Sequence, residues 1–404
     1  MTDEKIRDRL AKPVTLYIGF DPTADSLHIG SMVPIMVLAH AQRCGHRPIA
    51  VMGGGTALVG DPSGKTESRQ MLTPEVIDHN AHCFAQQMSP ILKFANPKTP
   101  QTNGPTDALM VNNAHWLTKL GWIGLLRDFG PHFSVNRMLT MDSVKNRLDA
   151  ESGLTFLEFN YMVMQAIDFV HLYKSQNCTV QMGGQDQWGN IVMGIELGRR
   201  VAGADLAGLT MPLITKSDGK KFGKSESGNV WLSAQRTPVF DFYQYWRNTP
   251  DADVKRFLGF FTFLPMDEIN RLGALEGQEL NQAKEVLAYE VTRLVHGHAE
   301  ADKARDSAGK AFAPGAQDVT GEAIPHAELP KQELTVGVGV IQLLVMAGLA
   351  KSNGEAKRLV ISGGVRLHDK PVKDISFKAT PDSVRNGYVL IRAGKKRLFR
   401  FDVK

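Results

Sequence analysis

The segment from Tyr17 to Ser31, YIGFDPTADSLHIGS, places polar side chains between an apolar run and the start of a helical pattern. At such a junction the first backbone N–H groups of the helix and its positive dipole end attract anions. Thr23 and His28 can donate hydrogen bonds to phosphate oxygens, and Gly30 would let an adenine or ribose approach the backbone closely. The alternative is an N-capping turn with a surface histidine, which His28 taken alone favours.

A second segment, GDPSGKTESR at residues 60–69, resembles the phosphate-binding P-loop G-x-x-x-x-G-K-[ST]. Only three residues separate Gly60 from Gly64, so the loop is one residue short and we reject that assignment. The remaining hypothesis is a flexible turn that presents Lys65 and Arg69 to a phosphate chain. A solvated basic loop is the alternative.

A third segment, DGKKFGKSESGNVW at residues 218–231, is rich in glycine and lysine and has little apolar anchoring. We therefore expect it to be mobile. Its lysines, Lys221 and Lys224, can close on a triphosphate as negative charge develops during a reaction. The alternative is again a solvated, lysine-rich loop.

Three hydrogen-bonding side chains, Tyr161, Gln165 and Asp168, share one face of a predicted helix. At about 100° per residue they fall within roughly 60° of one another. The other faces of this helix are apolar, as Met162 and Phe169 illustrate. Lys and Glu are the usual residues of a solvent-facing stripe, so a stripe of Tyr, Gln and Asp favours a binding surface over the solvent side of a helix.

The segment QMGGQDQWGN, residues 181–190, ends a predicted strand in two glycines. It then reaches Asp186 and Gln187, where we expect the next helix to begin. Glycines at the carboxyl end of a strand leave room for a ligand in an open α/β sheet. A tight turn between strand and helix is the alternative.

Both strands and helices, which differ in the periodicity of their apolar residues, must position these segments. Short apolar or β-branched runs alternate with helical patterns in the first half of the chain, which predicts a doubly wound α/β, Rossmann-like domain with a parallel sheet. The predicted strands are Thr15–Phe20, Pro48–Met52, Ala108–Val111, Thr179–Met182 and Leu209–Ile214. Amphipathic helices are predicted at Val239–Trp246, Asp251–Phe260 and Gln282–His298.

The chain is long enough for two or three domains. We expect the Rossmann-like domain over residues 1–225, a helical domain over 226–320, a linker over 321–333 and a small α+β unit over 334–404. The formal charge is +5, but residues 334–404 hold 14 Lys and Arg against 5 Asp and Glu. A basic C-terminal unit on a mildly acidic body suggests a polyanion-binding appendage, although such charge is often only a solvated face.

Composition argues against several other classes of protein. The three cysteines, Cys44, Cys83 and Cys178, are far apart, so neither a disulfide framework nor a zinc site is indicated. No apolar run reaches the roughly 18 residues of a membrane span, and the charged N-terminus is unlike a secretory signal. We expect a cytoplasmic protein with no membrane partner.

Taken together, the segments resemble the class I tyrosyl-tRNA synthetases of the bacterial type, over nearly the whole chain. HIGS at 28–31 is similar to the HIGH signature, and KFGKS at 221–225 to the KMSKS signature, about 190 residues further on. GDPSGK, Y-x-x-x-Q-x-x-D and QMGGQDQWGN lie between them. The departures are Ser31, where a second histidine is expected, and Phe222 and Gly223 within the second signature.

The resemblance implies a ligase that activates L-tyrosine with ATP and Mg²⁺ and charges tRNA(Tyr), as a homodimer without a tightly bound cofactor or a metal site of its own. The implied tyrosine-binding residues are Tyr17 and Asp168 at the phenol, and Asp61, Tyr161, Gln165 and Gln181 at the ammonium end. The implied ATP-binding residues are Asp21, Gly30, Gly183, Asp186, Gln187 and Lys224. The residues implied to act on the phosphates are Thr23, His28, Ser31, Lys65, Arg69, Lys221 and Lys224.

The C-terminal unit resembles an S4 RNA-binding module, most clearly in GEAKRLVISGGVRLHDKPVKD at 354–374. Basic side chains of this kind contact an RNA backbone and carry little sequence information. The residues implied are Lys357, Arg358, Arg366, Lys395, Lys396 and Arg397. Two alternatives stay open: a tryptophanyl synthetase, which shares the scaffold, and a non-catalytic RNA-binding protein built on it.

Overall fold

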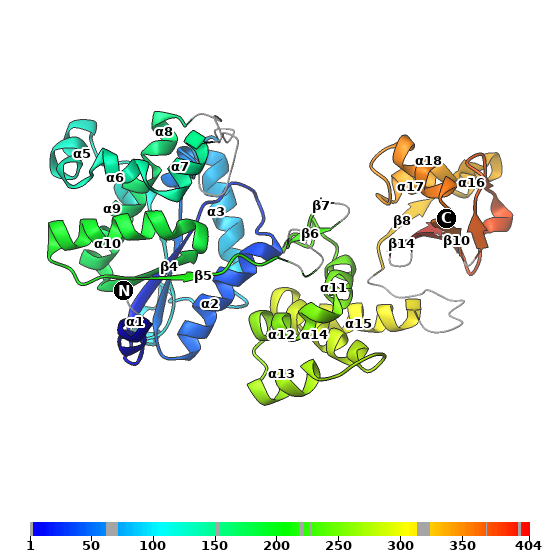
Figure 1. Cartoon of the computed structure of the whole chain (residues 1–404). Helices are drawn as coiled ribbons and strands as arrows, with labels where there is room; N and C mark the ends of the chain where they lie inside the picture. The colour runs from blue at the N-terminus through cyan, green and yellow to red at the C-terminus, as the bar shows by residue number, and fades with distance from the viewer. Residues whose placement is uncertain are drawn as a thin grey trace. The chain divides into compact units, whose positions relative to one another are not determined.

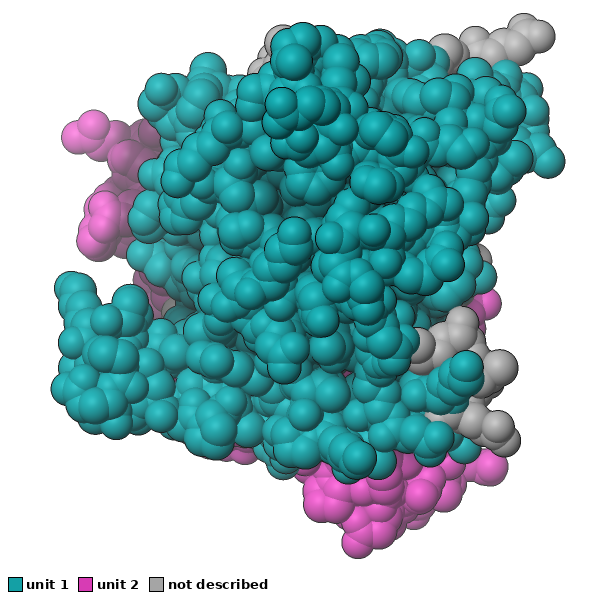
Figure 2. All heavy atoms as spheres, turned by 90° about the vertical axis from the view of Figure 1, so that its left-hand side faces the viewer, with its two compact units in different colours: residues 1–215 teal, residues 216–404 magenta. Residues whose placement is uncertain are grey.

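The computed structural model describes residues 3–61, 72–149, 154–215, 217, 222–225, 228–312, 324–368, 370–394 and 397–404. The chain divides into two compact units, unit 1 (residues 1–215) and unit 2 (residues 216–404), which are coloured separately in Figure 2. Unit 1 contains a parallel sheet between helices, and unit 2 contains a helical body and a second sheet (Figure 1). Within the described ranges, no helix has the length and apolar character needed to span a membrane.

The sheet of unit 1 has five strands in the order β3-β2-β1-β4-β5, all parallel. Its central strands are buried along most of their length, as expected where helices cover both faces. The strands are β1 (Thr15–Phe20), β2 (Arg47–Met52), β3 (Leu109–Asn112), β4 (Cys178–Gly184) and β5 (Ala207–Met211). This confirms the predicted doubly wound, Rossmann-like class.

Helices cover the two faces of this sheet. In Figure 1, α2 and α3 lie on one side and α9 and α10 on the other. The helices of unit 1 are α1 (Asp3–Leu10), α2 (Met32–Arg43), α3 (Pro74–Met88), α4 (Ala114–Leu117), α5 (Trp122–Asp128), α6 (Val135–Leu139), α7 (Asp142–Asp149), α8 (Phe156–Phe159), α9 (Tyr161–Gln176) and α10 (Trp188–Ala202). Short 3₁₀ turns are η1 (Ile29–Ser31), η2 (Thr56–Leu58), η3 (Pro100–Thr102), η4 (Gly130–His132) and η5 (Gln185–Gln187).

Local sequence explains where several of these helices begin and end. α3 begins with Pro74, whose missing N–H costs nothing at a first turn, after Thr73 as its cap. α9 ends where Asn177 adopts a left-handed conformation with φ 51°. α10 ends in the same way at Gly203, with φ 57°. The two helices that flank β4 are therefore fixed in length by their C-terminal residues.

The strand order reverses between β1 and β4. In open α/β sheets, ligands bind outside the carboxyl ends of the strands at this point. Tyr17 on β1 lies in register with Gln181 on β4, and the two strands lead to Asp21 and Asp186 respectively. The topology therefore places several of the predicted site residues at the position where such folds bind their ligands.

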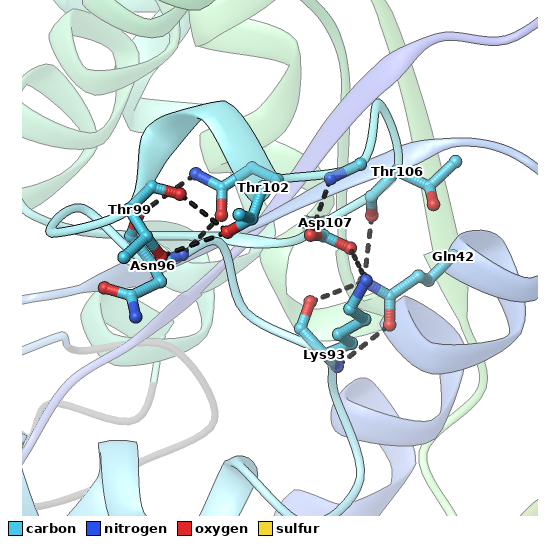
Figure 3. Close-up of polar contacts among 9 residues, drawn as sticks. Gln42, Lys93, Asn96, Thr99, Thr102, Thr106 and Asp107 are labelled. Atoms are coloured by element: carbon cyan, nitrogen blue, oxygen red, sulfur yellow. Dashed lines mark hydrogen bonds and ion pairs between the residues drawn. The ribbon is translucent and has the colours of Figure 1, made fainter.

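The segment between α3 and β3 is fastened to α2 by side-chain contacts (Figure 3). Gln42 Nε2 donates to the carbonyl oxygens of Lys93 and Thr106, each at 2.8 Å, and Gln42 Oε1 accepts from the Lys93 N–H at 3.1 Å. Lys93 Nζ also lies 2.9 Å from the carboxylate of Asp107. These contacts hold the chain that leads into β3, whose carboxyl end faces the same edge of the sheet as those of β1 and β4.

Unit 2 begins with a short hairpin and a helical body with an aromatic core. The elements are β6 (Lys224–Ser225), β7 (Gly228–Asn229), α11 (Val239–Arg247), η6 (Asp251–Asp253), α12 (Val254–Phe261), α13 (Met266–Gly273), α14 (Leu280–His296) and α15 (His298–Phe312). Almost fully buried aromatic residues of this body are Phe240, Phe242, Tyr243, Trp246, Phe257 and Phe261. We call α11–α15 the helical body.

The remainder of unit 2, which we call the C-terminal body, is built on a five-stranded sheet in the order β11-β10-β13-β14-β8. β14 runs antiparallel to β13 and parallel to β8. The elements are β8 (His326–Leu329), α16 (Lys331–Val336), β9 (Val338–Gly339), α17 (Val340–Met346), α18 (Asn353–Ile361), β10 (Val365–Leu367), β11 (Lys370–Val372), β12 (Lys378–Ala379), η7 (Pro381–Ser383), β13 (Tyr388–Ala393) and β14 (Arg397–Val403).

Several predicted segments differ from the structure in their bounds, and three of these differences concern β5, α14 and the expected linker. The strand predicted at Leu209–Ile214 starts earlier and ends at Met211, because Pro212 has no N–H for the ladder. The helix predicted through His298 ends at His296, where Gly297 adopts φ 87° and a new helix follows. Within the linker expected over 321–333, residues 326–329 form β8 and pair with β14.

Candidate active site

Tyr17 stands in the middle of β1 with its ring in the core between the sheet and α9. Its ring packs edge-on against Phe169 with centroids 5.3 Å apart, and only 2% of the residue is exposed. Its hydroxyl has no hydrogen-bond partner among the described residues. Burial and the nearby Asp168 raise the pKa of Tyr17 well above its usual value, so it stays a neutral phenol. A buried hydroxyl without a partner is costly in the empty protein and is suited to a polar ligand.

Asp168 is buried beside this phenol, and both of its carboxylate oxygens accept hydrogen bonds. Asn113 Nδ2 donates to Oδ2 at 2.9 Å, and Trp116 Nε1 donates to Oδ1 at 2.7 Å. Burial, only partly offset by these two bonds, raises the pKa of Asp168 to about 7. The indole of Trp116 is itself stacked on His171, one turn further along α9, with centroids 4.2 Å apart. The carboxylate is therefore held in one orientation from two directions.

A chain of hydrogen bonds connects Asp168 to Tyr161 at the start of α9. Asn113 Nδ2 also donates to Thr56 Oγ1 at 3.1 Å, and the Thr56 hydroxyl donates to Asp21 Oδ1 at 2.7 Å. The hydroxyl of Tyr161 donates to Asp21 Oδ2 at 2.9 Å. Burial and the charge of Asp21 raise the pKa of Tyr161 well above its usual value. This chain brings together residues from the ends of β1, β2 and β3 and from α9.

A second set of hydrogen bonds joins α9 to the start of α10. Asn190 Nδ2 donates to Gln165 Oε1 and to Gln187 Oε1, each at 3.1 Å. Gln187 Nε2 in turn donates to Asp61 at 2.8 Å and to Asp186 at 3.1 Å. Two carboxylates and two amide oxygens thus meet in one place, which is an environment suited to a cation such as an ammonium group.

Gln181 lies on β4 opposite Tyr17, and only 2% of it is exposed. Its Oε1 has no hydrogen-bond partner among the described residues. An ideal Cβ added at Gly194 would lie 3.3 Å from this oxygen, so Gly194 leaves the space that Gln181 occupies. Gln181 and Tyr17 are therefore two buried polar groups from adjacent strands for which the described protein supplies no partner.

The polar turn after β1 forms the capping turn that was one of the two interpretations of its sequence. His28 is exposed and caps η1, because its Nδ1 accepts from the Gly30 N–H at 3.0 Å. The ring covers Gly30 so closely that a Cβ there would lie 2.7 Å from it, which explains the glycine. Thr23 is exposed, and Ser31 precedes α2 without a capping hydrogen bond from its side chain. The capping turn is thus formed, and the exposed face of His28 stands at a helix start.

The glycines that end β4 lie close to the side chains of the turn that follows. A Cβ on Gly184 would lie 2.4 Å from Asp186 Oδ1, and one on Gly183 would lie 3.1 Å from Gln187 Cβ. Asp186 and Gln187 belong to the 3₁₀ turn η5 and not yet to the helix α10, which begins at Trp188. The glycines therefore let η5 fold back onto the strand and set Asp186 and Gln187 at the carboxyl end of the sheet.

Several predicted residues fall outside the described part of the chain. Lys65 and Arg69 lie within 62–71, Lys221 within 218–221, and Lys395 and Lys396 also lie outside the described residues. The backbone of Lys224 is described and pairs with Asn229 in the β6–β7 hairpin.

The remaining predicted RNA-binding residues lie in the C-terminal body. Lys357 and Arg358 are exposed on α18, and Arg366 is exposed on β10. Arg397 at the start of β14 donates from Nη1 to the carbonyl of Leu349 at 3.2 Å. Arg397 thus helps to hold the fold of this body, in addition to its predicted role.

Sequence reasoning missed Thr56, Asn113, Trp116 and Asn190, which hold the predicted residues in place. Asn113 and Trp116 directly follow β3, in the segment MVNNAHW. Polar residues at the carboxyl end of a parallel strand are a usable signal, because such ends gather at one edge of a sheet. That signal would have found Asn113, but nothing in the sequence pairs it with Asp168.

Two family models match the chain in succession. The family described as tRNA synthetases class I (W and Y) matches residues 9–313, and the family described as the Tyrosine--tRNA ligase SYY-like C-terminal domain matches residues 317–401. The first match alone spans well over half of the chain.

Curated relatives and solved structures agree with the family models. Tyrosine--tRNA ligases of Clostridium kluyveri and Clostridium botulinum are each 48% identical over 403 residues, which is 100% of this chain and 95% of each relative. A C-terminally truncated mitochondrial tyrosyl-tRNA synthetase of Aspergillus nidulans matches with a TM-score of 0.66 and 32% identity, over 77% of this chain and 90% of that one. A tyrosyl-tRNA synthetase of Archaeoglobus fulgidus, complexed with L-tyrosine, shares the fold with a TM-score of 0.55 at 17% identity, over 75% and 94%. The chain therefore belongs to the class I tRNA synthetases, and within them to the family of tyrosine–tRNA ligases.

Proposed function

We propose that L-tyrosine and ATP bind at the carboxyl ends of β1 and β4, where the protein forms tyrosyl-adenylate and pyrophosphate and then passes the tyrosyl group to the 3′ end of tRNA(Tyr) in the cytoplasm. The observation that carries the proposal is the buried pair of Tyr17 and Asp168. The Tyr17 hydroxyl has no partner among the described residues, and the Asp168 carboxylate is held beside it by Asn113 and Trp116. A substrate phenol would accept from Tyr17 and donate to Asp168. The indole N–H of tryptophan can only donate, so the pair favours tyrosine.

The ammonium group of tyrosine would lie between the two hydrogen-bonded sets. Asp61, Tyr161 and Gln165 each present an oxygen, and Gln181 lies nearby on β4. One unit of positive charge among these oxygens makes charge-assisted hydrogen bonds, which are about twice as strong as neutral ones. Tyrosine is then bound at its phenol and at its ammonium group, and its carboxylate remains available for the reaction.

ATP would occupy the carboxyl ends of the strands, as its triphosphate suits a helix start and basic side chains. Asp21, Gly30, Gly183, Asp186 and Gln187 are the proposed contacts of the nucleoside. Thr23, His28 and Ser31 lie on the turn that opens α2, and Lys65, Arg69, Lys221 and Lys224 are the proposed cations. Mg²⁺ would enter with ATP as part of the substrate, because it binds phosphate oxygens and keeps several waters.

The first reaction needs no general base, because the tyrosine carboxylate is already a nucleophile. One of its oxygens bonds to the α-phosphorus while the bond to the bridging oxygen breaks, and the electron pair leaves with pyrophosphate. A hydroxyl of the tRNA terminal ribose then attacks the carbonyl carbon of the adenylate, and AMP leaves. The protein contributes position and positive charge to the first step, which are the main sources of rate where no bond to the protein forms.

The C-terminal body is the proposed tRNA-binding part of unit 2. Lys357, Arg358 and Arg366 are exposed there, and backbone contacts by such side chains position RNA. The proposed domain boundaries are those expected from the sequence, apart from the linker, which ends before β8.

We also propose a homodimer joined through α5–α8 of unit 1. These helices expose Ile123 (73%) and Phe156 (68%), and the rings of Phe156 and Trp122 meet edge-on at 6.1 Å. Apolar groups gathered in this way mark association surfaces. α5 lies at the left of Figure 1, on the side that faces the viewer in Figure 2.

Sedimentation should show a dimer that Ile123→Glu converts to a monomer. The control Ile361→Glu, at an equally exposed position on α18, should leave the dimer intact.

ATP–pyrophosphate exchange with each amino acid in turn tests the function itself. We expect exchange with tyrosine alone, and aminoacylation of tRNA(Tyr) by the same preparation. A folded protein that shows no exchange with any amino acid would be the non-catalytic RNA-binding alternative. Exchange driven by tryptophan would show that the Tyr17 and Asp168 pair has been misread.

A further inference from the structure

The segment that carries Lys221 and Lys224 is anchored by an aromatic side chain, contrary to the prediction from its sequence. Phe222 stacks on Phe261 with centroids 5.3 Å apart and 10° between the planes, and meets Phe257 edge-on at 5.2 Å. The rings of Trp246 and Tyr245 lie 6.0 and 6.5 Å away. Three of these four partners are almost fully buried in the core of the helical body. The sequence suggested little apolar anchoring because Phe222 is the only large apolar residue in its glycine- and lysine-rich surroundings.

The backbone next to Phe222 is held as well. Gly223 adopts φ 88°, a conformation that other residues rarely take, and its carbonyl accepts from the Val230 N–H at 2.9 Å. Lys224 then pairs with Asn229 in the β6–β7 hairpin. The β6–β7 hairpin, which contains Lys224, therefore follows the anchored Phe222 closely in the chain. After the hairpin, the chain continues into the buried Val230.

A third contact holds the chain before the lysines. Both the N–H and the hydroxyl of Ser217 donate to Asp253 Oδ2, each at 2.9 Å. Asp253 is 2% exposed, and its other oxygen accepts from Arg256 at 2.6 Å. The segment is thus held at two residues: Ser217 bonds to η6, and Phe222 packs against α11 and α12. Of the two, Phe222 is the one adjacent to Lys221 in the sequence.

We propose that Phe222 is a positioning residue for adenylate formation, which fixes the backbone that leads into Lys224 and the β6–β7 hairpin. This rests on the proposed role of the two lysines in stabilising the triphosphate. A long lysine side chain stabilises a transition state only if its base is held, since a displacement of about 1 Å far from the chemistry can cost roughly a hundred-fold in rate. Phe222 touches no reacting atom, so it acts through its neighbours.

The test is a series of full-length variants, Phe222→Leu and Phe222→Ala, assayed by pyrophosphate exchange. We expect kcat to fall by a few-fold in the leucine variant and by roughly 10- to 100-fold in the alanine variant, while KM for tyrosine stays unchanged. The matched control is Phe260→Ala, which removes an exposed ring from the same helix α12 and should leave kcat unchanged. Parental kcat in both Phe222 variants would overturn the proposal. If the alanine variant does not fold, the leucine variant alone decides by the same criterion.

A second comparison separates positioning from general stability. In a background that carries Lys221→Ala and Lys224→Ala, Phe222→Ala should lower kcat less than two-fold, because there is no lysine side chain left to position. An equal loss in both backgrounds would show that Phe222 acts elsewhere, and would overturn the proposal. If the lysine variants themselves retain full exchange activity, the proposed function of the lysines fails instead, and that outcome is read from the lysine variants alone.

Discussion

At the scale of single residues, the binding site depends on hydrogen-bonding groups for which no apolar residue can substitute. Tyr17 and Asp168 present a donor and an acceptor in a dry core, and Asn113 and Trp116 determine which way the carboxylate faces. Phenylalanine bound in place of tyrosine would present a C–H group to the Tyr17 hydroxyl and to the Asp168 carboxylate, and would form a hydrogen bond with neither. Unpaired buried polar groups are costly, so we expect the proposed site to reject phenylalanine by binding alone.

The first prediction concerns the hydroxyl of Tyr17. Tyr17→Phe should lower kcat/KM for tyrosine roughly ten-fold and leave the value for phenylalanine nearly unchanged, because one neutral hydrogen bond to the substrate is lost. The ratio of the two kcat/KM values is the measurement. Tyr173→Phe makes the same chemical change in the same core cluster and serves as the control. An unaltered ratio in Tyr17→Phe would remove Tyr17 from the phenol site.

The second prediction follows from the pKa of Asp168, which burial raises to about 7. The carboxyl group is neutral below that pH and ionised above it, and the ionised form accepts the phenol hydrogen in a charge-assisted bond that is about twice as strong as a neutral one. Tyrosine affinity should therefore rise as the pH rises from 6 to 8. Isothermal titration at each pH measures it, and Asp168→Asn should show weak, flat binding over the same range. An equally steep profile in the asparagine variant would assign the titration to another group.

At the scale of elements, short helices near the site are tied together by buried charge. Arg147 on α7 pairs with Glu158 on α8 at 3.2 Å, and the two side chains are only 4% and 8% exposed. Thr155 completes a capping box with Glu158. Burial alone would raise the pKa of Glu158, but the bonds from Thr155 and the charge of Arg147 outweigh it and lower the pKa. α8 leads directly into α9, so this pair supports the helix that carries Tyr161 and Asp168.

The third prediction is that Glu158→Gln destabilises the protein by about 3 kcal/mol at pH 7, the cost of leaving a buried charge unpaired. The lowered pKa means that this stability is present above the unfolded pKa and is lost as the pH falls through the folded value. The difference between the urea midpoints of the parent and of Glu158→Gln should therefore be smaller at acidic pH than at pH 7. Glu268→Gln breaks an exposed pair with Arg271 at 2.7 Å and should leave the urea midpoint nearly unchanged, because exposed ion pairs contribute little to stability. Equal effects of the two substitutions would contradict the account.

Element types followed from the sequence more readily than element ends. β1 was predicted to the residue, because its apolar run is bounded by a polar turn on each side. β8 was missed, because HAEL is only four residues long and half of it is exposed, and its partner β14 lies about seventy residues away. Phe222 was misjudged for the same reason. Its neighbours in sequence are glycine and lysine, and the rings that receive it come from α11 and α12.

At the scale of the whole molecule, chemistry and RNA binding are assigned to different parts of the chain. The Rossmann-like sheet and the proposed tyrosine site belong to unit 1, and the excess of Lys and Arg over Asp and Glu lies in residues 334–404. The two family models meet between residues 313 and 317, near the start of the C-terminal body and not at the boundary between the two units.

The fourth prediction is that a chain ending at Phe312 keeps tyrosine-dependent pyrophosphate exchange within a few-fold of the parent, but loses most of its tRNA charging. A truncation at this point removes β8 together with β14, so no unpaired strand is left behind. Exchange and aminoacylation rates measured on the same preparation decide the question. Charging should also weaken steeply with salt in the parent, because backbone contacts release counterions. Parental charging by the truncated chain would assign tRNA binding to the remaining part.

The pairing of β8 with β14 also sets the order in which the protein can form during its synthesis. The parallel sheet of unit 1 is complete once Met211 has left the ribosome, so it can fold while the rest of the chain is still being made. The first strand of the C-terminal body must wait for Arg397–Val403 before it has a neighbour. The proposed RNA-binding part is therefore assembled last, after the sheet that carries the proposed tyrosine site.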